Sequence, residues 1–287
     1  MLCYKELMEL LPPWMRTTLG TTLQDKPVSE LRLRLGAFPQ LAGRGEEWYP
    51  VTRTVTGSDI SFVVNNASHF SAYAAQSLPL GYLTAPGGHR IGLSGQWLMR
   101  GGEPSGIKHI HALCIRIARD FPSVGKDALT SLNNGSVLIL GPPGCGKTTL
   151  LRDLIRLISD SRQEQITVID QREELFPPYY GGYYFSPGMR TDVLTGVPKE
   201  LGMEIALRVL TPAWIAVDEI TGVADAMAME RSVHSGVRFL ATAHGDSLSD
   251  LQIRPAYKRL LDMKLFSTLI LMDKHGKYTM EELTKEC

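Results

Sequence analysis

A glycine-rich loop between an apolar run and a helical pattern constrains the fold of this chain more than any other feature. The run SVLIL at residues 136–140 leads into GPPGCGKT at 141–148, and the amphipathic segment TLLRDLIRLIS follows. A strand, a loop of this spacing and a helix form the context that a Walker A phosphate-binding loop requires. The segment therefore predicts a nucleotide site, and a chance glycine-rich turn is the weaker alternative.

The residue types in this loop match what phosphate binding needs. Gly141, Gly144 and Gly146 let backbone amides approach the phosphates, because no side chain stands in the way. Lys147 places a cation on the outer phosphates, and the hydroxyl of Thr148 can bind Mg²⁺. The other loop residues expected to line the site are Pro142, Pro143, Cys145 and Thr149.

Two carboxylates follow about 70 residues after the loop, where the apolar run WIAV ends in Asp218 and Glu219. An aspartate at a strand end beside the phosphate loop would hold the magnesium shell through water, so Asp218 is the second expected metal residue. The adjacent glutamate could orient and polarise the attacking water, which favours hydrolysis over kinase chemistry. An exposed acidic pair at a strand end is the simpler alternative.

Two more strand-like runs deliver polar side chains to the same region. VRFLATAH ends in His244, where a polar group would lie beside the γ-phosphate and report its loss to a mobile element. We therefore expect His244 to act as a sensor, and a capping or turn histidine is the alternative. ITVID ends in Asp170 and is followed by the charged and polar residues 171–174, and the spacing does not say which of these reach the site.

The two parts of the chain differ in pattern, and a length of 287 residues with 44% apolar composition favours two domains. Residues 1–122 read as a smaller α+β N-terminal domain, with short alternating strands and one amphipathic helix over 58–77 capped by Ser58. In residues 136–287 buried strands alternate with helices, which predicts an α/β, RecA-like P-loop domain with a mainly parallel sheet. Residues 123–135 are expected to be a linker, because Pro, Gly and Asn punctuate them.

Composition excludes several other classes of protein. Lys plus Arg and Asp plus Glu both number 30, and residues 1–125 hold 12 basic against 9 acidic residues, so there is no strong nucleic-acid signal. No apolar run approaches the roughly 18 residues that span a bilayer, so we expect no direct membrane insertion. The four cysteines are far apart and suit a reducing cytoplasm, with Cys145 a tolerated small residue. An N-K-x-D guanine motif is lacking, which leaves ATP with Mg²⁺ as the expected ligand.

The motifs together resemble the stage III sporulation protein AA family. The segments that carry the resemblance are LRLRLG, GGHRIGLSG, GPPGCGKTTLLRDLIR, VIDQREEL, GMRTDVL, WIAVDEI and ATAHGDS. MRTDVL is the discriminating piece, because generic P-loop ATPases do not carry it. The family is similar to the secretion ATPases of type II and type IV systems, which form hexameric rings. The resemblance implies a homo-oligomeric ring, an acidic box that holds Asp170 and Glu174, and a histidine box that holds His244.

The resemblance also implies that arginines of the N-terminal domain reach the nucleotide. Arg90 in GGHRIG and Arg116 or Arg119 in LCIRIAR lie where secretion ATPases place arginines at a domain or subunit boundary. A guanidinium that arrives on closure would stabilise charge on the transferred phosphoryl group, and arginine fingers elsewhere contribute about 10³ to 10⁵ in rate. For each of the three, a solvated arginine on a half-exposed strand is the alternative.

Membership in this family implies a location and partners that composition does not show. It implies the mother-cell cytoplasm of an endospore-forming bacterium, at the membrane around the forespore, with recruitment by membrane proteins of the channel that joins the two cells. ATP hydrolysis would power assembly of that channel or transport through it. Two other functions stay open, a nucleic-acid-dependent RecA-like ATPase and a nucleotide-switched scaffold with little hydrolysis.

Overall fold

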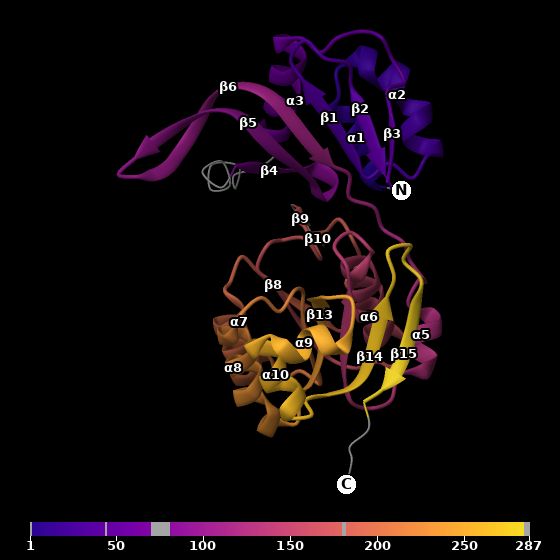
Figure 1. Ribbon diagram of the computed structural model, residues 1–287, viewed down its shortest axis with the longest axis vertical. Coiled ribbons are helices and arrows are strands. Elements are labelled where there is room, and N and C mark those ends of the chain that lie inside the picture. Colours follow the sequence, from indigo (N-terminus) through magenta and orange to yellow (C-terminus); the bar gives the residue numbers. More distant parts are fainter. Residues whose placement is uncertain (1, 44, 70–80, 180–181, 284–287) are drawn as a thin grey trace. The chain divides into compact units, whose positions relative to one another are not determined.

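The chain forms two compact units in the computed structural model, which describes residues 2–43, 45–69, 81–179 and 182–283 (Figure 1). The first unit holds Met1–Asp120 with Tyr179–Tyr184, and the second holds Phe121–Pro178 with Phe185–Cys287. Residues 123–135, the expected linker, thus lie in the second unit and include the short helix α5 (Lys126–Ser131).

A six-stranded antiparallel sheet forms the first unit, in the order β3-β2-β1-β6-β5-β4. Its strands are β1 (Glu30–Arg34), β2 (Gln40–Gly43), β3 (Glu46–Trp48), β4 (Tyr82–Ala85), β5 (His89–Arg100) and β6 (Glu103–Arg116). Leu31 and Leu33 of β1 are buried, whereas the residues that alternate with them are partly or fully exposed. One face of the sheet therefore joins a hydrophobic core, and the other face is polar.

Three helices share that core: α1 (Leu2–Leu10), α2 (Pro13–Asp25) and α3 (Gly57–His69). Met15, Leu19 and Leu23 recur every four residues in α2 and are buried, so one stripe of this helix faces the sheet. The prediction that Ser58 caps the third helix is wrong. Thr56 Oγ accepts from the amide of Asp59 at 3.3 Å, and the Asp59 carboxylate accepts from the amide of Thr56 at 2.9 Å, which is a capping box. Residues 70–77, the rest of the expected helix, lie outside the described residues.

The hairpin of β5 and β6 is longer than the sequence indicates and projects from the sheet (Figure 1). The two strands pair as far as Arg100 opposite Glu103. Trp97, Leu98 and Met99 are exposed along the outer part of β5.

A seven-stranded sheet forms the second unit, in the order β11-β8-β12-β13-β7-β14-β15. Every pairing is parallel except that of β14 with β15. The strands are β7 (Ser136–Gly141), β8 (Ile166–Asp170), β11 (Thr191–Thr195), β12 (Trp214–Val217), β13 (Arg238–His244), β14 (Phe266–Met272) and β15 (Tyr278–Glu282). All residues of β7, β8 and β12 are buried, as central strands of a covered parallel sheet should be.

The helices of the second unit are α5, α6 (Lys147–Ser161), α7 (Lys199–Ile205), α8 (Val223–Ser232), α9 (Leu248–Ile253) and α10 (Pro255–Asp262). Apolar residues of α7 to α10 form one buried cluster with the central strands. A short π-helical turn, Ala206–Leu210, continues α7, and β9 (Pro178–Tyr179) pairs with β10 (Gly182–Tyr183). The α/β class is confirmed: an α/β, RecA-like unit with a mainly parallel sheet follows a smaller α+β unit.

Parallel strands bring their carboxyl ends to one edge of the sheet. The neighbouring strands β8, β12, β13 and β7 end at Asp170, Val217, His244 and Gly141. In open α/β sheets this edge is where ligands bind. The fold thus gathers the phosphate loop, Asp170, Asp218 and His244 along one line.

Candidate nucleotide site

The phosphate loop joins β7 to α6 and presents the amino end of that helix. Gly146 stands at the N-cap position with φ 103°, a conformation that favours glycine, and it has no side chain to occupy the first amides of α6. A Cβ on Gly141 would lie 2.9 Å from the carbonyl oxygen of Met272 and 2.8 Å from Cys145 Sγ, so only glycine fits there. Free amides at the positive end of a 15-residue helix attract an anion, which fits a phosphate.

Lys147 is the first residue of α6 and lies buried under the loop. Its Nζ donates to the carbonyl oxygens of Gly141 and Pro142 at 2.9 and 2.7 Å. Burial lowers the pKa of Lys147, while the nearby Cys145 and the carboxylates of Asp218 and Glu219 act in the opposite direction. The carbonyl oxygens of the phosphate loop therefore hold the ammonium of Lys147 inside the loop.

His244 links Lys147 to Glu219. Its Nδ1 lies 3.0 Å from Lys147 Nζ, and its Nε2 lies 3.4 Å from Glu219 Oε1. An ammonium has donors only, so Nδ1 accepts from it and Nε2 carries the proton that faces the carboxylate. The sheet edge thus joins three of the predicted catalytic side chains in one chain of contacts.

Asp218 follows β12 and is fixed by two hydroxyls. Its Oδ2 accepts from Thr148 Oγ at 2.9 Å, and its Oδ1 accepts from Thr242 Oγ at 2.6 Å. Thr242 Oγ in turn accepts from the amide of Glu219 at 2.7 Å. The hydroxyl of Thr242 therefore helps to fix the side chain of Asp218 and the backbone of Glu219. The sequence pattern did not indicate this role.

The residues present fit Mg²⁺ bound with a nucleotide. Thr148 and Asp218 offer two hard oxygen donors side by side, and Mg²⁺ takes few protein ligands and keeps water and phosphate oxygens for the rest. Among the described residues there is no group of three or more His, Cys, Asp or Glu that would suit a metal held by protein alone.

Glu219 adopts a strained backbone conformation with φ 54°. Its carboxylate is about one third exposed and contacts Arg172 Nη1 at 2.9 Å as well as His244. Its carbonyl oxygen accepts a hydrogen bond from Lys199 Nζ. Sequence reasoning named Arg172 only as one of the residues after Asp170 and missed Lys199, because no motif marks it.

Asp170 shapes the loop after β8. Its carboxylate accepts from the amides of Glu174, Leu175 and Phe176 at 2.9, 3.0 and 2.8 Å. Burial raises the pKa of Asp170 to about 6, although the hydrogen bonds from Phe176 and Leu175 lower it. The carbonyl oxygen of Glu174 accepts from Arg152 Nη2 at 2.9 Å. The catalytic roles expected for Asp170 and Glu174 stay predictions.

The three arginines named from the resemblance lie in the first unit. Arg90 and Arg116 face each other across β5 and β6, on the polar side of the sheet, and the Arg90 guanidinium lies 3.8 Å from the centre of the Tyr82 ring. Arg119 Nη2 donates to the carbonyl oxygens of Leu23 and Lys26 at 3.0 and 3.2 Å, at the end of α2. Their reach to a nucleotide stays a prediction.

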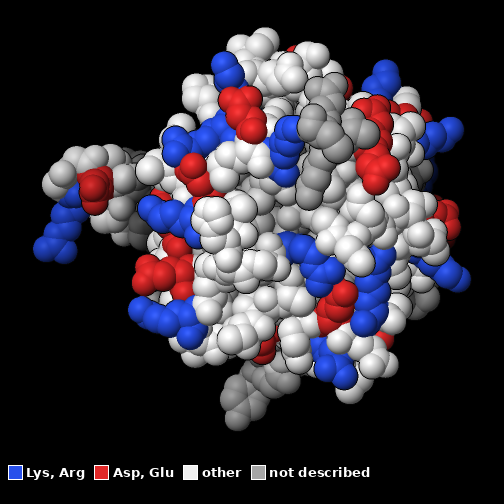
Figure 2. Space-filling model, turned by 90° about the horizontal axis from the view of Figure 1, so that it is seen from below, with Lys and Arg blue, Asp and Glu red and all other residues white. Residues whose placement is uncertain are grey.

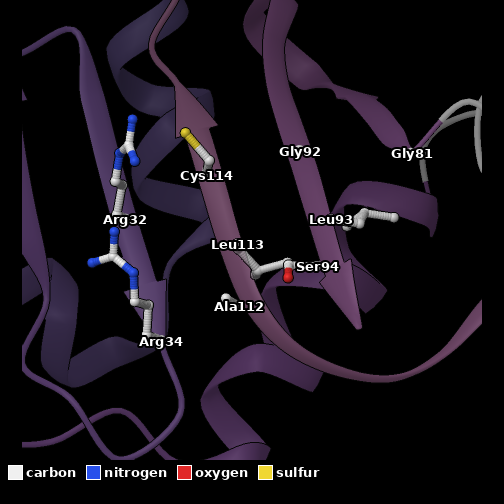
Figure 3. Close-up of a pocket in the computed structure, with 9 residues that line it drawn as sticks. All are labelled: Arg32, Arg34, Gly81, Gly92, Leu93, Ser94, Ala112, Leu113 and Cys114. Atoms are coloured by element: carbon white, nitrogen blue, oxygen red, sulfur yellow. The ribbon is translucent and has the colours of Figure 1, made fainter. Parts of the chain in front are cut away.

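The polar face of the first unit also holds a hollow of about 360 Å³ (Figure 3). The hollow is open over β5 and β6 because the residues there are small, and arginines of β1 line one side of it. Its lining includes Arg32, Arg34, Gly92, Ser94, Ala112 and Cys114. Arg32 Nη2 donates to Glu30 Oε2 at 2.7 Å, and Arg34 Nη1 donates to Oε1 of the buried Gln40 at 2.6 Å. Sequence reasoning did not single out this feature.

A second hollow of about 300 Å³ adjoins Glu219 in the second unit. Residues 219–223, His244 and residues 254–257 line it. Arg254 Nη1 donates to the carbonyl oxygen of His244 at 2.6 Å, and the Tyr257 hydroxyl donates to that of Ile220. The turn after β12 is therefore held from the side of α10.

A phosphate-binding loop at the carboxyl edge of a parallel sheet, with an acidic pair beside it, defines a P-loop protein of the ATPase fold class. The crystal structure of the ATPase DotB of Legionella pneumophila agrees with this chain at a TM-score of 0.63 and 16% identity, over 91% of this chain and 76% of that one. The pilus retraction motor PilT with bound ADP gives a TM-score of 0.60 and 16% identity, over 91% and 80%. At these identities the agreement shows the fold.

The sequence itself shows the family. The profile described as "Sporulation stage III, protein AA" matches residues 4–281. Stage III sporulation protein AA of Bacillus subtilis (strain 168) is 34% identical over 279 residues, which cover 94% of this chain and 91% of that protein. The chain belongs to the sporulation stage III protein AA family, as its motifs predict. Among the described residues, no helix has the length and apolar character needed to cross a membrane.

Proposed function

We propose that this protein hydrolyses ATP with Mg²⁺ and that the second unit carries the reaction. One observation carries the proposal: Lys147, His244 and Glu219 form a continuous chain of contacts beside a loop shaped for phosphate. Two proteins of similar fold support it, since one is named an ATPase and the other holds ADP.

Each side chain has a task that its position suits. Lys147 and the amides of the loop bind the β- and γ-phosphates, and Thr148 with Asp218 would hold the metal ion. When bound there, Mg²⁺ would supply positive charge that offsets the charge developing on the phosphate oxygens. Glu219 orients the attacking water and accepts its proton.

His244 is placed to report the state of the γ-phosphate. A phosphate that draws the ammonium of Lys147 toward itself competes with Nδ1 of His244, and the other ring nitrogen faces Glu219. Loss of the phosphate restores the contact. The histidine thereby couples the contents of the loop to the carboxylate that serves the water.

Family membership and the resemblance to secretion ATPases support a proposal for the wider role. The active form is a ring of identical subunits, expected to be a hexamer, in which Arg90, Arg116 or Arg119 completes the site. The ring works on the cytoplasmic face of a membrane in the mother cell, recruited by membrane proteins of the sporulation channel, and drives assembly of that channel or transport through it.

A nucleic-acid substrate has less support. Figure 2 shows one face of the molecule on which basic and acidic groups are interspersed, with no continuous field of one sign. Nucleic-acid binding depends on such a basic field, because phosphate contacts supply most of its affinity.

The test separates nucleotide binding from hydrolysis. Glu219→Gln should bind a fluorescent ADP analogue as tightly as the wild type, within about threefold, while turnover of Mg-ATP falls by 10² or more, since only the water-orienting group is lost. Glu200→Gln, at an exposed position of α7, is the matched control and should keep wild-type turnover. Wild-type protein that hydrolyses no more ATP than Lys147→Ala would refute the proposal.

A further inference from the structure

Lys199 occupies a place that is unfavourable for a lysine. It is the first residue of α7, where the positive end of the helix repels a cation, and its side chain is only 10% exposed. Burying an ammonium is costly unless it is paired and hydrogen-bonded. The contacts of Lys199 must therefore offset two penalties.

Those contacts lie on the turn between β12 and α8 and on the first turn of α8. Lys199 Nζ donates to the carbonyl oxygen of Glu219 and pairs with Asp225 Oδ2 at 3.4 Å. The same carboxylate oxygen accepts from the amide and the hydroxyl of Thr221 at 2.9 and 3.0 Å. Lys199 thus binds the start of the turn at Glu219, and Asp225 binds its middle at Thr221.

The turn needs such support because Glu219 has a left-handed backbone. A non-glycine residue in this region is strained, and relaxation would rotate the Cα–Cβ bond that aims the carboxylate. The bond from Lys199 holds the carbonyl of the strained residue, while Arg172 and His244 hold its side chain. A displacement of about 1 Å at a reacting group can cost 10² in rate.

We infer that Lys199, supported by Asp225, is a positioning residue that holds Glu219 in the conformation used for hydrolysis. The inference rests on the proposed function, since Glu219 is the water-orienting group there. Lys199 acts through the peptide of Glu219, and the cation for phosphate is supplied by Lys147.

The first experiment measures kcat and nucleotide affinity separately. Lys199→Met, which keeps the length of the side chain and removes its donors, should lower kcat about 10- to 100-fold and leave the affinity for a fluorescent ADP analogue within about threefold. Lys199→Arg keeps a buried cation with N–H donors and should recover at least part of that loss. Lys258→Met, on the exposed side of α10, controls for removal of a lysine. Equal kcat in Lys199→Met and wild type would overturn the inference.

The second measurement does not depend on hydrolysis. Hydrogen exchange followed by mass spectrometry should show faster exchange in peptides that cover residues 218–225 in Lys199→Met, with the phosphate loop unchanged. If the wild type proves unable to hydrolyse ATP, the proposed function fails and exchange alone decides whether Lys199 holds the turn. Exchange equal to that of the wild type would overturn the positioning role in either case.

Discussion

Thr242 and Thr167 are both buried on strands of the same sheet, yet their hydroxyls have opposite surroundings. The hydroxyl of Thr242 donates to Asp218 and accepts from the amide of Glu219. The hydroxyl of Thr167 has no hydrogen-bond partner within the part of the chain that the structure describes. A buried polar group without a partner is destabilising, whereas removing one member of a satisfied pair leaves the other unpaired.

Replacing each threonine by valine should therefore change stability in opposite directions. Thr242→Val should lower the free energy of unfolding by about 1–3 kcal/mol and also lower ATP turnover. Thr167→Val should raise the free energy of unfolding by up to about 1 kcal/mol and leave turnover unchanged. Guanidinium unfolding of both variants checks this, and equal effects at the two sites would contradict the assigned contacts.

Asp170 makes stability depend on pH in a direction opposite to that of a salt-bridged carboxylate. Because its pKa is raised from 3.8 to about 6 in the folded state, its contribution is full below pH 3.8 and is lost as the pH rises through 6. From pH 7 to pH 5 the wild type should gain on the order of 1 kcal/mol of stability relative to Asp170→Asn. Parallel pH profiles for the two proteins would show that the pKa of Asp170 is not raised.

At the scale of elements, α6 does more than present the phosphate loop. Asp153 lies buried on this helix, and its carboxylate accepts from the amides of Ser123 and Gly125 at 3.0 and 2.8 Å. Asp160, near the end of the helix, accepts from the amide of Met189 at 2.8 Å. The helix thus anchors two segments that have little regular structure of their own.

Removing these anchors should release different segments. Asp153→Ala should speed proteolysis within residues 119–127 by about tenfold, which corresponds to roughly 1.4 kcal/mol of local stability. Asp160→Ala, the matched control on the same helix, should speed cleavage within residues 186–191 instead. Limited proteolysis with mass mapping tests this, and unchanged cleavage at 119–127 in Asp153→Ala would mean that other contacts hold that segment.

At the scale of the whole molecule, the proposed ring predicts a dependence on concentration. If neighbouring subunits complete the site, ATP turnover per subunit should rise steeply with protein concentration over about three decades and then reach a plateau. A flat and appreciable rate would mean that each chain holds its whole site.

The arginine assignments can be tested at the plateau. Arg90→Ala or Arg116→Ala should lower the rate by 10² or more if the guanidinium meets the transferred phosphoryl group. Arg100→Ala, in the projecting part of the β5–β6 hairpin, is the control and should be neutral. Wild-type turnover in Arg90→Ala and Arg116→Ala would show that neither guanidinium acts on the transferred phosphoryl group.

The sequence by itself determined what depends on neighbours in the chain. The order of β7, loop and α6, the buried runs that become parallel strands, and the acidic pair after β12 all follow from local pattern and composition. Such patterns also place Asp170, Asp218 and His244 at one sheet edge, because parallel strands align their carboxyl ends.

Only the tertiary structure decided which side chains touch. Lys199 and Arg172 reach Glu219 across 20 and 47 residues of sequence, and neither lies in a motif that pairs it with that glutamate. The capping residue of α3 and the reach of the β5–β6 hairpin were likewise settled by three-dimensional geometry. Contacts between distant residues depend on distances and backbone angles that only the folded chain establishes. The spacing of residues in the sequence therefore does not predict these contacts.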